Sequence, residues 1–199
     1  FMVSTDDAYV GASMSLVAPK VAAYVKEVAI ADNQRVKAGD VLVRLDDGDF
    51  KLAVDQAAAK VATQKATVAT FDAQIQSAKA TATQARAQLV AAKATVLRTE
   101  ADFNRSESLA RQNFTPKANL DAARAARDSA RAQVASQEAA IQTAEANVEV
   151  LSSQKVQAER LTQELEVALE KARRDLSFTV ITAPFDGVIG NKSVQVGDY

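Results

Sequence analysis

The chain is 199 residues long. Although 48% of it is hydrophobic, only 5% is aromatic, and much of the apolar share is alanine. Because alanine buries little area per residue, this composition favours an elongated protein with a thin core over a compact one. The 24 basic and 25 acidic residues are interspersed, which disfavours a nucleic-acid groove or a polybasic membrane patch. Histidine and cysteine are absent, which excludes disulfides, Cys–His nucleophile pairs and the usual zinc sites.

Residues 1–16 include one predicted strand, residues 5–10, which looks like part of a further β module. The first residues, Phe1-Met2-Val3, do not resemble a translation start, so we expect a fragment whose targeting segment lies upstream. The sequence has no run of about 20 apolar residues, and no segment is therefore expected to span a bilayer.

Residues 17–48 read as one half of a small β domain. Short β-branched and aliphatic runs, such as Tyr24-Val25 and Val41-Leu42-Val43, alternate with turn signals at Asp32-Asn33 and Ala38-Gly39-Asp40. Beyond this half the sequence loses its turn-forming residues, because no glycine occurs between Gly48 and Gly187. Within this interval the only proline before Pro184 is Pro116. We therefore expect two uninterrupted elements that meet near Pro116.

Residues 49–112 are predicted to form the first helix of a coiled coil, because apolar residues recur every seven positions in two sets. The second set is mostly small, so two helices can approach closely. The a positions are Val54, Val61, Val68, Ile75, Ala82, Leu89, Val96 and Phe103, and the d positions are Ala57, Gln64, Phe71, Ala78, Ala85, Ala92 and Thr99.

Residues 113–116 are predicted to be the hairpin tip. Asn113 suits a left-handed cap, Thr115 suits an N-cap, and Pro116 suits the first helical position. Two arms of equal length around this turn, each about 90 Å long at 1.5 Å per residue, predict an antiparallel two-helix coiled coil.

Residues 117–177 repeat the heptad pattern less cleanly. Four polar positions interrupt the two seams, and they are either register markers or irregularities tolerated at a seam edge. One ladder is Leu120, Val134, Ile141 and Val148, the other is Ala123, Ala130, Gln137, Ala144, Leu151, Ala158, Leu165 and Ala172, and the polar interruptions are Gln64, Arg127, Gln137 and Lys155.

Residues 178–199 look like the second β half, with turns expected at Pro184, Asp186-Gly187, Gly190-Asn191 and Gly197-Asp198. The two ends resemble each other: an Ala-Pro pair at 18–19 precedes a Gly-Asp turn at 39–40, and an Ala-Pro pair at 183–184 precedes another at 197–198. The predicted fold class is therefore α+β, with a long helical hairpin inserted between the two halves of one pseudo-symmetric β domain.

This pattern resembles the membrane fusion proteins, or periplasmic adaptor proteins, of the HlyD/EmrA type. The resemblance covers essentially the whole chain, and its specific part is a split biotinyl/lipoyl-like domain combined with an intervening coiled coil. The opening looks most like adaptors that serve major-facilitator exporters, with residues 1–16 as strands of a membrane-proximal β-barrel module. The matching segments are Thr5-Asp6-Asp7-Ala8-Tyr9-Val10, residues 18–25, residues 32–42 and residues 180–190.

The resemblance implies a periplasmic protein anchored to the inner membrane of a Gram-negative cell. It implies that the β portions sit on an inner-membrane exporter, that the hairpin reaches a TolC-like outer-membrane channel for drug efflux, and that several copies assemble as a trimer or hexamer. Related adaptors place an Arg, a Leu four residues later and a Ser seven beyond that at the tip. Arg105 and Leu109 match, whereas Pro116 stands at the Ser position beside Thr115. The predicted channel-contact set is Arg105, Leu109, Phe114, Thr115, Pro116 and Lys117.

Other interpretations of the tip are open on the residues alone. Arg105 and Lys117 also suit a solvated helix end or polar loop, and Phe114 is either a partner anchor or a cap over the seam. No cofactor is expected, because the hairpin replaces the turn that carries the modifiable lysine of true lipoyl carriers. No catalytic site is expected either, since the carboxylates lie on outer helix faces, where they serve solvation or i,i+4 pairing.

Alternative functions are an adaptor of a type I (ABC) secretion system, a purely structural coiled-coil spacer and a biotin or lipoyl carrier subunit. The spacer explains the helices but not the two matched β halves, and the carrier lacks its acceptor turn. The residue pair Asp46-Asp47 before the first helix fits a capping region better than an acid/base pair.

Overall fold

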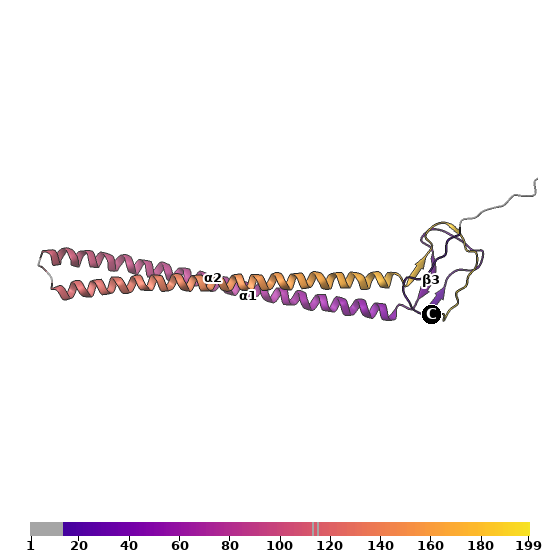
Figure 1. Ribbon diagram of the computed structural model, residues 1–199, viewed down its shortest axis with the longest axis horizontal. Helices are drawn as coiled ribbons and strands as arrows, with labels where there is room; N and C mark the ends of the chain where they lie inside the picture. Colours follow the sequence, from indigo (N-terminus) through magenta and orange to yellow (C-terminus); the bar gives the residue numbers. More distant parts are fainter. Residues whose placement is uncertain (1–13, 113, 115) are drawn as a thin grey trace, which may run out of the picture. The chain divides into compact units, whose positions relative to one another are not determined.

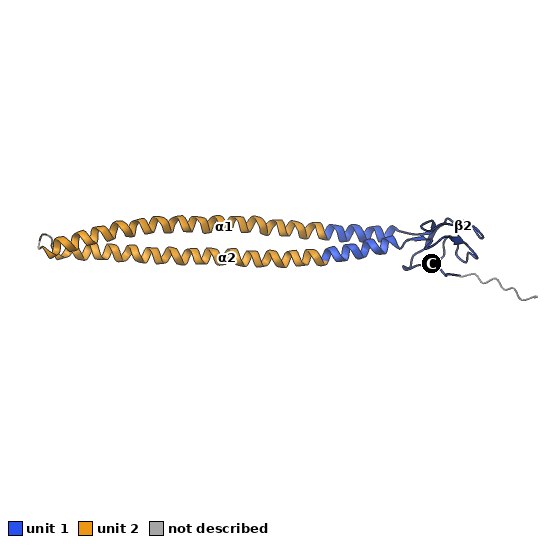
Figure 2. Ribbon diagram, turned by 90° about the horizontal axis from the view of Figure 1, so that it is seen from above, with its two compact units in different colours: residues 1–60, 165–199 blue, residues 61–164 orange. Residues whose placement is uncertain are grey.

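The computed structural model describes residues 14–112, 114 and 116–199. The chain divides into two compact units, one made of residues 1–60 with 165–199 and the other of residues 61–164 (Figure 2). The strand expected at residues 5–10, the left-handed cap expected at Asn113 and the N-cap expected at Thr115 lie outside the described residues.

Among its described residues, the first unit contains five short strands. These strands come from both ends of the sequence (Figure 1). β1 (Val25–Val28), β3 (Val41–Leu45) and β4 (Val180–Thr182) form one antiparallel sheet in the order β1-β3-β4. β2 (Arg35–Val36) pairs antiparallel with β5 (Gly187–Val188). Both sheets join a strand that precedes the helices to one that follows them, so the expected split β domain is confirmed.

The core of this unit is apolar and also combines both halves of the sequence. In β3 the side chains of Leu42, Val43 and Leu45 are buried while Arg44 is exposed. Ala183, from the second half, is buried in the same cluster. Removing these apolar surfaces from water is the main stabilising contribution available to so small a sheet.

The two halves of the β domain contain two similar turns, each with a glycine at positive φ. Gly39 has a φ of 90°, and its N–H donates to the carbonyl of Ala183 at 2.8 Å. Gly197 has a φ of 95°, and its N–H donates to the carbonyl of Val25 at 2.9 Å. Positive φ strains any residue with a Cβ, which accounts for glycine at both turns. The expected equivalence of the two Gly-Asp turns is thereby confirmed.

The Ala-Pro equivalence expected from the sequence is wrong. The return hydrogen bonds run from Ala183 N–H to the carbonyl of Asp40 and from Val25 N–H to the carbonyl of Asp198. Ala183 therefore corresponds to Val25 and not to Ala18, seven residues earlier. The turn expected at Asp186-Gly187 is correct only for its first residue: Asp186 lies in a bend formed by residues 184–186, whereas Gly187 lies in β5 opposite Val36, where strand pairing across the two halves overrides the local turn propensity of Asp-Gly.

The helices α1 (Gly48–Arg111) and α2 (Lys117–Ser177) run side by side in opposite directions (Figures 1 and 2). The expected capping role of the residues before α1 is confirmed, because a carboxylate oxygen of Asp46 accepts a hydrogen bond from Gly48 N–H at 3.1 Å. Pro116 immediately precedes α2, one residue before the first helical position expected for it.

Within the hairpin unit, burial follows the predicted heptads. Between Val61 and Thr99 on α1, every a and d residue is buried or half-buried and every other residue is exposed. The predicted ladder residues of α2 are likewise buried or half-buried. The narrow stripe is the seam of a two-helix coiled coil, which has room for only two residues per heptad.

Three of the four polar seam residues make specific contacts, mostly across the seam. The Gln64 side-chain amide donates to the carbonyl of Ala158 at 3.2 Å, and the Lys155 ammonium lies 2.8 Å from the Asp72 carboxylate. The guanidinium of Arg127 lies over the ring of Phe103 at 4.2 Å. These contacts favour register markers over tolerated irregularities, because they hold only at one alignment of the helices.

Alkaline pH is expected to destabilise the hairpin through Lys155. The hydrogen bond that the Lys155 ammonium donates to the Asp72 carboxylate raises the pKa of Lys155 above its ordinary value of 10.5, against the opposing effect of desolvation. The folded state therefore holds this proton more tightly than the unfolded chain. The stabilisation is complete below the ordinary pKa and is lost as pH rises through the folded one. Melting temperatures followed by circular dichroism between about pH 9 and pH 12 should fall more steeply for wild type than for Lys155→Met; parallel curves would contradict this.

The glycine turns offer a second stability test. Gly39→Ala is expected to lower the free energy of unfolding by about 1–2 kcal/mol, because a Cβ is strained at positive φ even where space is free. An added Cβ at Gly39 or at Gly190 would meet nothing within 4 Å, but Gly190 has no positive φ. Gly190→Ala is therefore the matched control and should leave stability unchanged or slightly raised in urea denaturation. Equal losses for both variants would disprove the strain argument.

Candidate partner-binding site

The hairpin tip exposes an aromatic side chain on a hydrogen-bonded turn. The carbonyl of Leu109, in the last turn of α1, accepts hydrogen bonds from the N–H groups of Gln112 at 3.3 Å and Phe114 at 2.9 Å. These bonds satisfy one of the free carbonyls that every helix end leaves. Phe114 is 76% exposed and Leu109 is 41% exposed. Phe114 therefore does not cover the seam, and the tip presents apolar surface to solvent.

The remaining predicted contact residues at the tip are also exposed, as far as they lie among the described residues. The Arg105 side chain is 72% exposed, with its guanidinium 3.8 Å from the Asp102 carboxylate. Such an exposed pair stabilises little, so the guanidinium can exchange this carboxylate for a partner's acceptor at little cost. Pro116 and Lys117 are exposed, and Thr115 lies outside the described residues.

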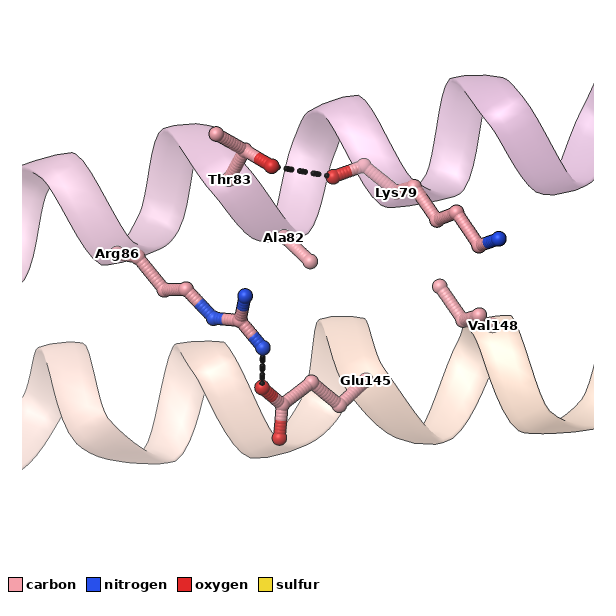
Figure 3. A pocket seen from close by; sticks show the side chains of 6 residues that line it. All are labelled: Lys79, Ala82, Thr83, Arg86, Glu145 and Val148. Atoms are coloured by element: carbon pink, nitrogen blue, oxygen red, sulfur yellow. Dashed lines mark hydrogen bonds and ion pairs between the residues drawn. The ribbon is translucent and has the colours of Figure 1, made fainter.

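The two helices are also joined by a ladder of ion pairs along one edge of the seam. Figure 3 shows one rung, in which the Arg86 guanidinium lies 2.6 Å from the Glu145 carboxylate beside the seam residues Ala82 and Val148. Further rungs join Lys93 to Glu138 at 3.7 Å and Arg131 to Glu100 at 2.8 Å, and Lys155 to Asp72.

This ladder was not predicted from the sequence, which indicated solvated charges or i,i+4 pairs on the outer faces. The available signal is the strict seven-residue spacing of the charged residues between positions 61 and 97 of α1, which places each of them at the heptad position beside the seam, as Arg86 and Lys93 show. Each exposed ion pair contributes little to stability. Whether a pair of charges attracts or repels nevertheless depends on which residues of the two helices lie opposite one another. The ladder therefore reports on helix alignment.

The lowered pKa of Asp47 at the start of α1 has a structural cause. The hydrogen bond with Lys51, whose ammonium lies 2.7 Å away, is the main cause that lowers the pKa of Asp47 at the start of α1. A carboxylate kept ionised there complements the positive end of the helix dipole. Among the described residues no group of three or more acidic side chains is placed to hold a metal ion.

Neither described helix has an apolar stretch long enough to cross a bilayer. The grooves along the seam are lined by alanine, valine and charged side chains, as Figure 3 shows for Lys79, Ala82 and Val148. In the hairpin unit, the features that suit contact with another protein are therefore the exposed tip and the helix faces.

Comparison with known proteins places this fold in a family. Residues 14–199 match the family model described as "RND MFP, barrel-sandwich hybrid domain". The chain is 29% identical over 203 residues to the "Multidrug resistance protein MdtN" of Shigella flexneri, covering 98% of this chain and 56% of that protein. It is 31% identical over 197 residues to the "Colistin resistance protein EmrA" of Acinetobacter baumannii, covering 99% of this chain and 56% of that protein. The chain thus spans little more than half the length of these relatives.

The solved structure described as "Structure of the periplasmic adaptor protein EmrA" superposes on 92% of this chain and 67% of that chain, with a TM-score of 0.50 and 20% sequence identity. At that identity the likeness concerns the fold alone. It agrees with the β domain closed by strands from both ends of the chain and with the inserted hairpin. Because the family model covers nearly the whole chain, the protein belongs to the membrane fusion proteins, in the family of the barrel-sandwich hybrid domain.

Proposed function

We propose that the protein is a periplasmic adaptor, anchored to the inner membrane, that bridges an inner-membrane exporter to a TolC-like outer-membrane channel in drug efflux. The observation that carries this proposal is the closure of the β unit by β3–β4 and β2–β5 pairing. The start of α1 and the end of α2 thereby belong to one unit, whereas the other ends of both helices belong to the second unit, so we assign one partner to each unit.

The comparisons support this function by what the relatives are called. The Shigella flexneri relative is a multidrug resistance protein and the Acinetobacter baumannii relative a colistin resistance protein. We assign the adaptor no turnover of its own: it connects and seals, and transport energy comes from the exporter. The exporter is of the major-facilitator type, and the adaptor self-associates as a trimer or hexamer in the assembled complex.

The proposed channel contact is the exposed tip. Phe114 and Leu109 offer apolar area that a helical channel end can cover, and aromatic anchors of this kind often dominate interface energies. Arg105 offers several N–H donors to carbonyl or carboxylate groups of the channel. Thr115, Pro116 and Lys117 complete the contact set around the turn. Pro116 cannot supply the hydroxyl that related adaptors place there, so we assign that hydrogen bond to Thr115.

The contact predicts that Arg105→Asp abolishes crosslinking between the full-length adaptor and the outer-membrane channel in intact cells. Reversing the charge removes the donors and places a carboxylate against acceptors. The matched control is Arg98→Asp, which makes the same change one heptad earlier on the same helix face. The control should crosslink as wild type does. Unchanged crosslinking of Arg105→Asp, or equal loss in both variants, would rule out a specific contact at the tip.

Bridging also predicts that hairpin length matters independently of folding. Deleting residues 87–93 together with 138–144 removes one heptad from each arm and keeps Arg86 opposite Glu145. The adaptor should fold with a matched seam, yet drug export should be lost because the tip falls about 10 Å short. Export is measured by drug accumulation in cells and folding by circular dichroism. Normal export by the shortened protein would favour the structural spacer.

A further inference from the structure

Small rotations at the base of the hairpin are amplified along its length. Each helix continues without a break from the first unit into the hairpin unit. α1 has 64 residues, and a helix of that size is about 96 Å long. A rotation of about 5° at one end of such a helix displaces the other end by about 8 Å. The contacts at the base therefore decide whether a contact at the far end is made.

α2 passes into β4 through a link of two residues. The helix ends at Ser177 and the strand begins at Val180. The second residue of the link, Thr179, is 2% exposed. Its hydroxyl donates to the carbonyl of Leu176 at 2.7 Å, and its own carbonyl accepts from the N–H of Leu45, in β3, at 2.8 Å. These bonds fix one point of the link, about which the end of α2 can still rotate.

The first residue of the link, Phe178, contacts two cations with its ring. The Lys20 ammonium lies 4.8 Å from the ring centroid, and the guanidinium carbon of Arg174 lies 6.0 Å from it. Both distances fall within the range of about 6 Å over which a cation is attracted to a ring face. Arg174 belongs to the last turn of α2, whereas Lys20 precedes β1. We call these three residues the basal cluster.

Lys20 lies at the point where the segment before β1 becomes attached to the first unit. Residues 14–19 are exposed, and Met14 and Leu16 are 95% and 92% exposed. Immediately after Lys20, Val21 and Ala23 pack against the apolar core. A displacement of the exposed segment therefore reaches Lys20 before it reaches the core.

The strength of the cluster suits a contact that holds a position and can also be released. A cation–π contact at an exposed site favours the closed arrangement over the open one by about two- to fivefold. The lysine stem can lie along the ring while its ammonium stays hydrated, so opening the contact leaves no buried charge. The contact therefore biases the end of α2 without locking it.

We propose that Phe178 is a positioning residue that sets the direction of the helix bases relative to the sheets of the first unit, and that Lys20 couples this direction to the segment before β1. The inference rests on the proposed function, in which residues 1–16 lie toward the exporter and the tip contacts a channel. Displacing that segment withdraws Lys20 from the ring and leaves the end of α2 to rotate about Thr179. The basal cluster thereby links events at the exporter to the position of the tip.

Distances between spin labels test this inference, because the chain has no cysteine and labels can be attached at chosen positions. In the full-length protein, labels at Ala29→Cys beside β1 and Ala168→Cys at the base of α2 report on the direction of the helix; both positions are exposed. Phe178→Leu keeps an apolar side chain but has no ring. It should raise the fraction of distances outside the wild-type peak about two- to fivefold. Phe178→Tyr retains the ring face and should give the wild-type distribution.

The lysine is tested in the same way. Lys20→Met removes the charge and keeps an unbranched stem, so it should broaden the distribution as Phe178→Leu does, whereas Lys20→Arg should not. The matched control is Lys37→Met, at another exposed lysine of the first unit. Among the described residues the cation–ring contacts involve Lys20, Arg127 and Arg174, so the control should leave the distances unchanged. Circular dichroism checks that every variant is folded.

Three results would overturn the inference. The first is a wild-type distance distribution in Phe178→Leu, and the second is a broadened one in Phe178→Tyr. The third is equal broadening in Lys20→Met and Lys37→Met, because a general effect of surface charge would then replace the ring contact.

Crosslinking to the outer-membrane channel separates this inference from the proposed function. Phe178→Leu should weaken the crosslinking of the tip about two- to fivefold, and Phe178→Tyr should not. Full crosslinking in Phe178→Leu would refute the claim that the basal cluster positions the tip, while the adaptor function would stand. If wild type itself gives no channel crosslink but the distances change as expected, the adaptor function fails and the role of Phe178 at the helix base holds.

Discussion

The alignment of α1 with α2 is the constraint on which the rest of the structure depends. The start of α1 and the end of α2 belong to the same unit as the strands. Thr182 can pair with Val41, and Gly187 with Val36, only when the returning helix ends at the correct height. An error in the alignment along the seam is therefore carried into the β domain, where it breaks backbone hydrogen bonds that no side chain can replace.

How much the sequence could predict depends on whether a feature is local. The heptads could be predicted because the residues that become buried in a helix recur at a fixed spacing within one segment, here from Val61 to Phe103. The ion pair between Arg86 and Glu145 could not be predicted from one helix, because it depends on which residues of two distant segments lie opposite one another. The repeat was misaligned for the same reason: the Ala-Pro pairs resemble each other in sequence, whereas the hydrogen bonds of Val25 and Ala183 depend on the closed domain. At the tip, sequence left two roles for Phe114, and its 76% exposure argues against one of them, the cap over the seam.

The division of charge holds the two helices of the hairpin in alignment. Placing the charges of the central stretch beside the seam, as with Lys93 and Glu138, satisfies them within one chain. At the tip, by contrast, Arg105 and Phe114 are both exposed, so the tip presents a cation and an aromatic group at its surface.

A purely apolar seam would not fix the alignment, because a slip of one heptad buries nearly the same residues. The ladder penalises that slip in both directions. Charge changes sign between Lys93 and Glu100 on α1 and between Arg131 and Glu138 on α2. Sliding α2 one way brings Lys93 opposite Arg131, and sliding it the other way brings Glu100 opposite Glu138. Each slip thus creates a like-charged pair, and it also separates Lys155 from Asp72. The ion pairs therefore select one register because the other registers place like charges opposite one another. This selection does not require any single ion pair to contribute much to stability.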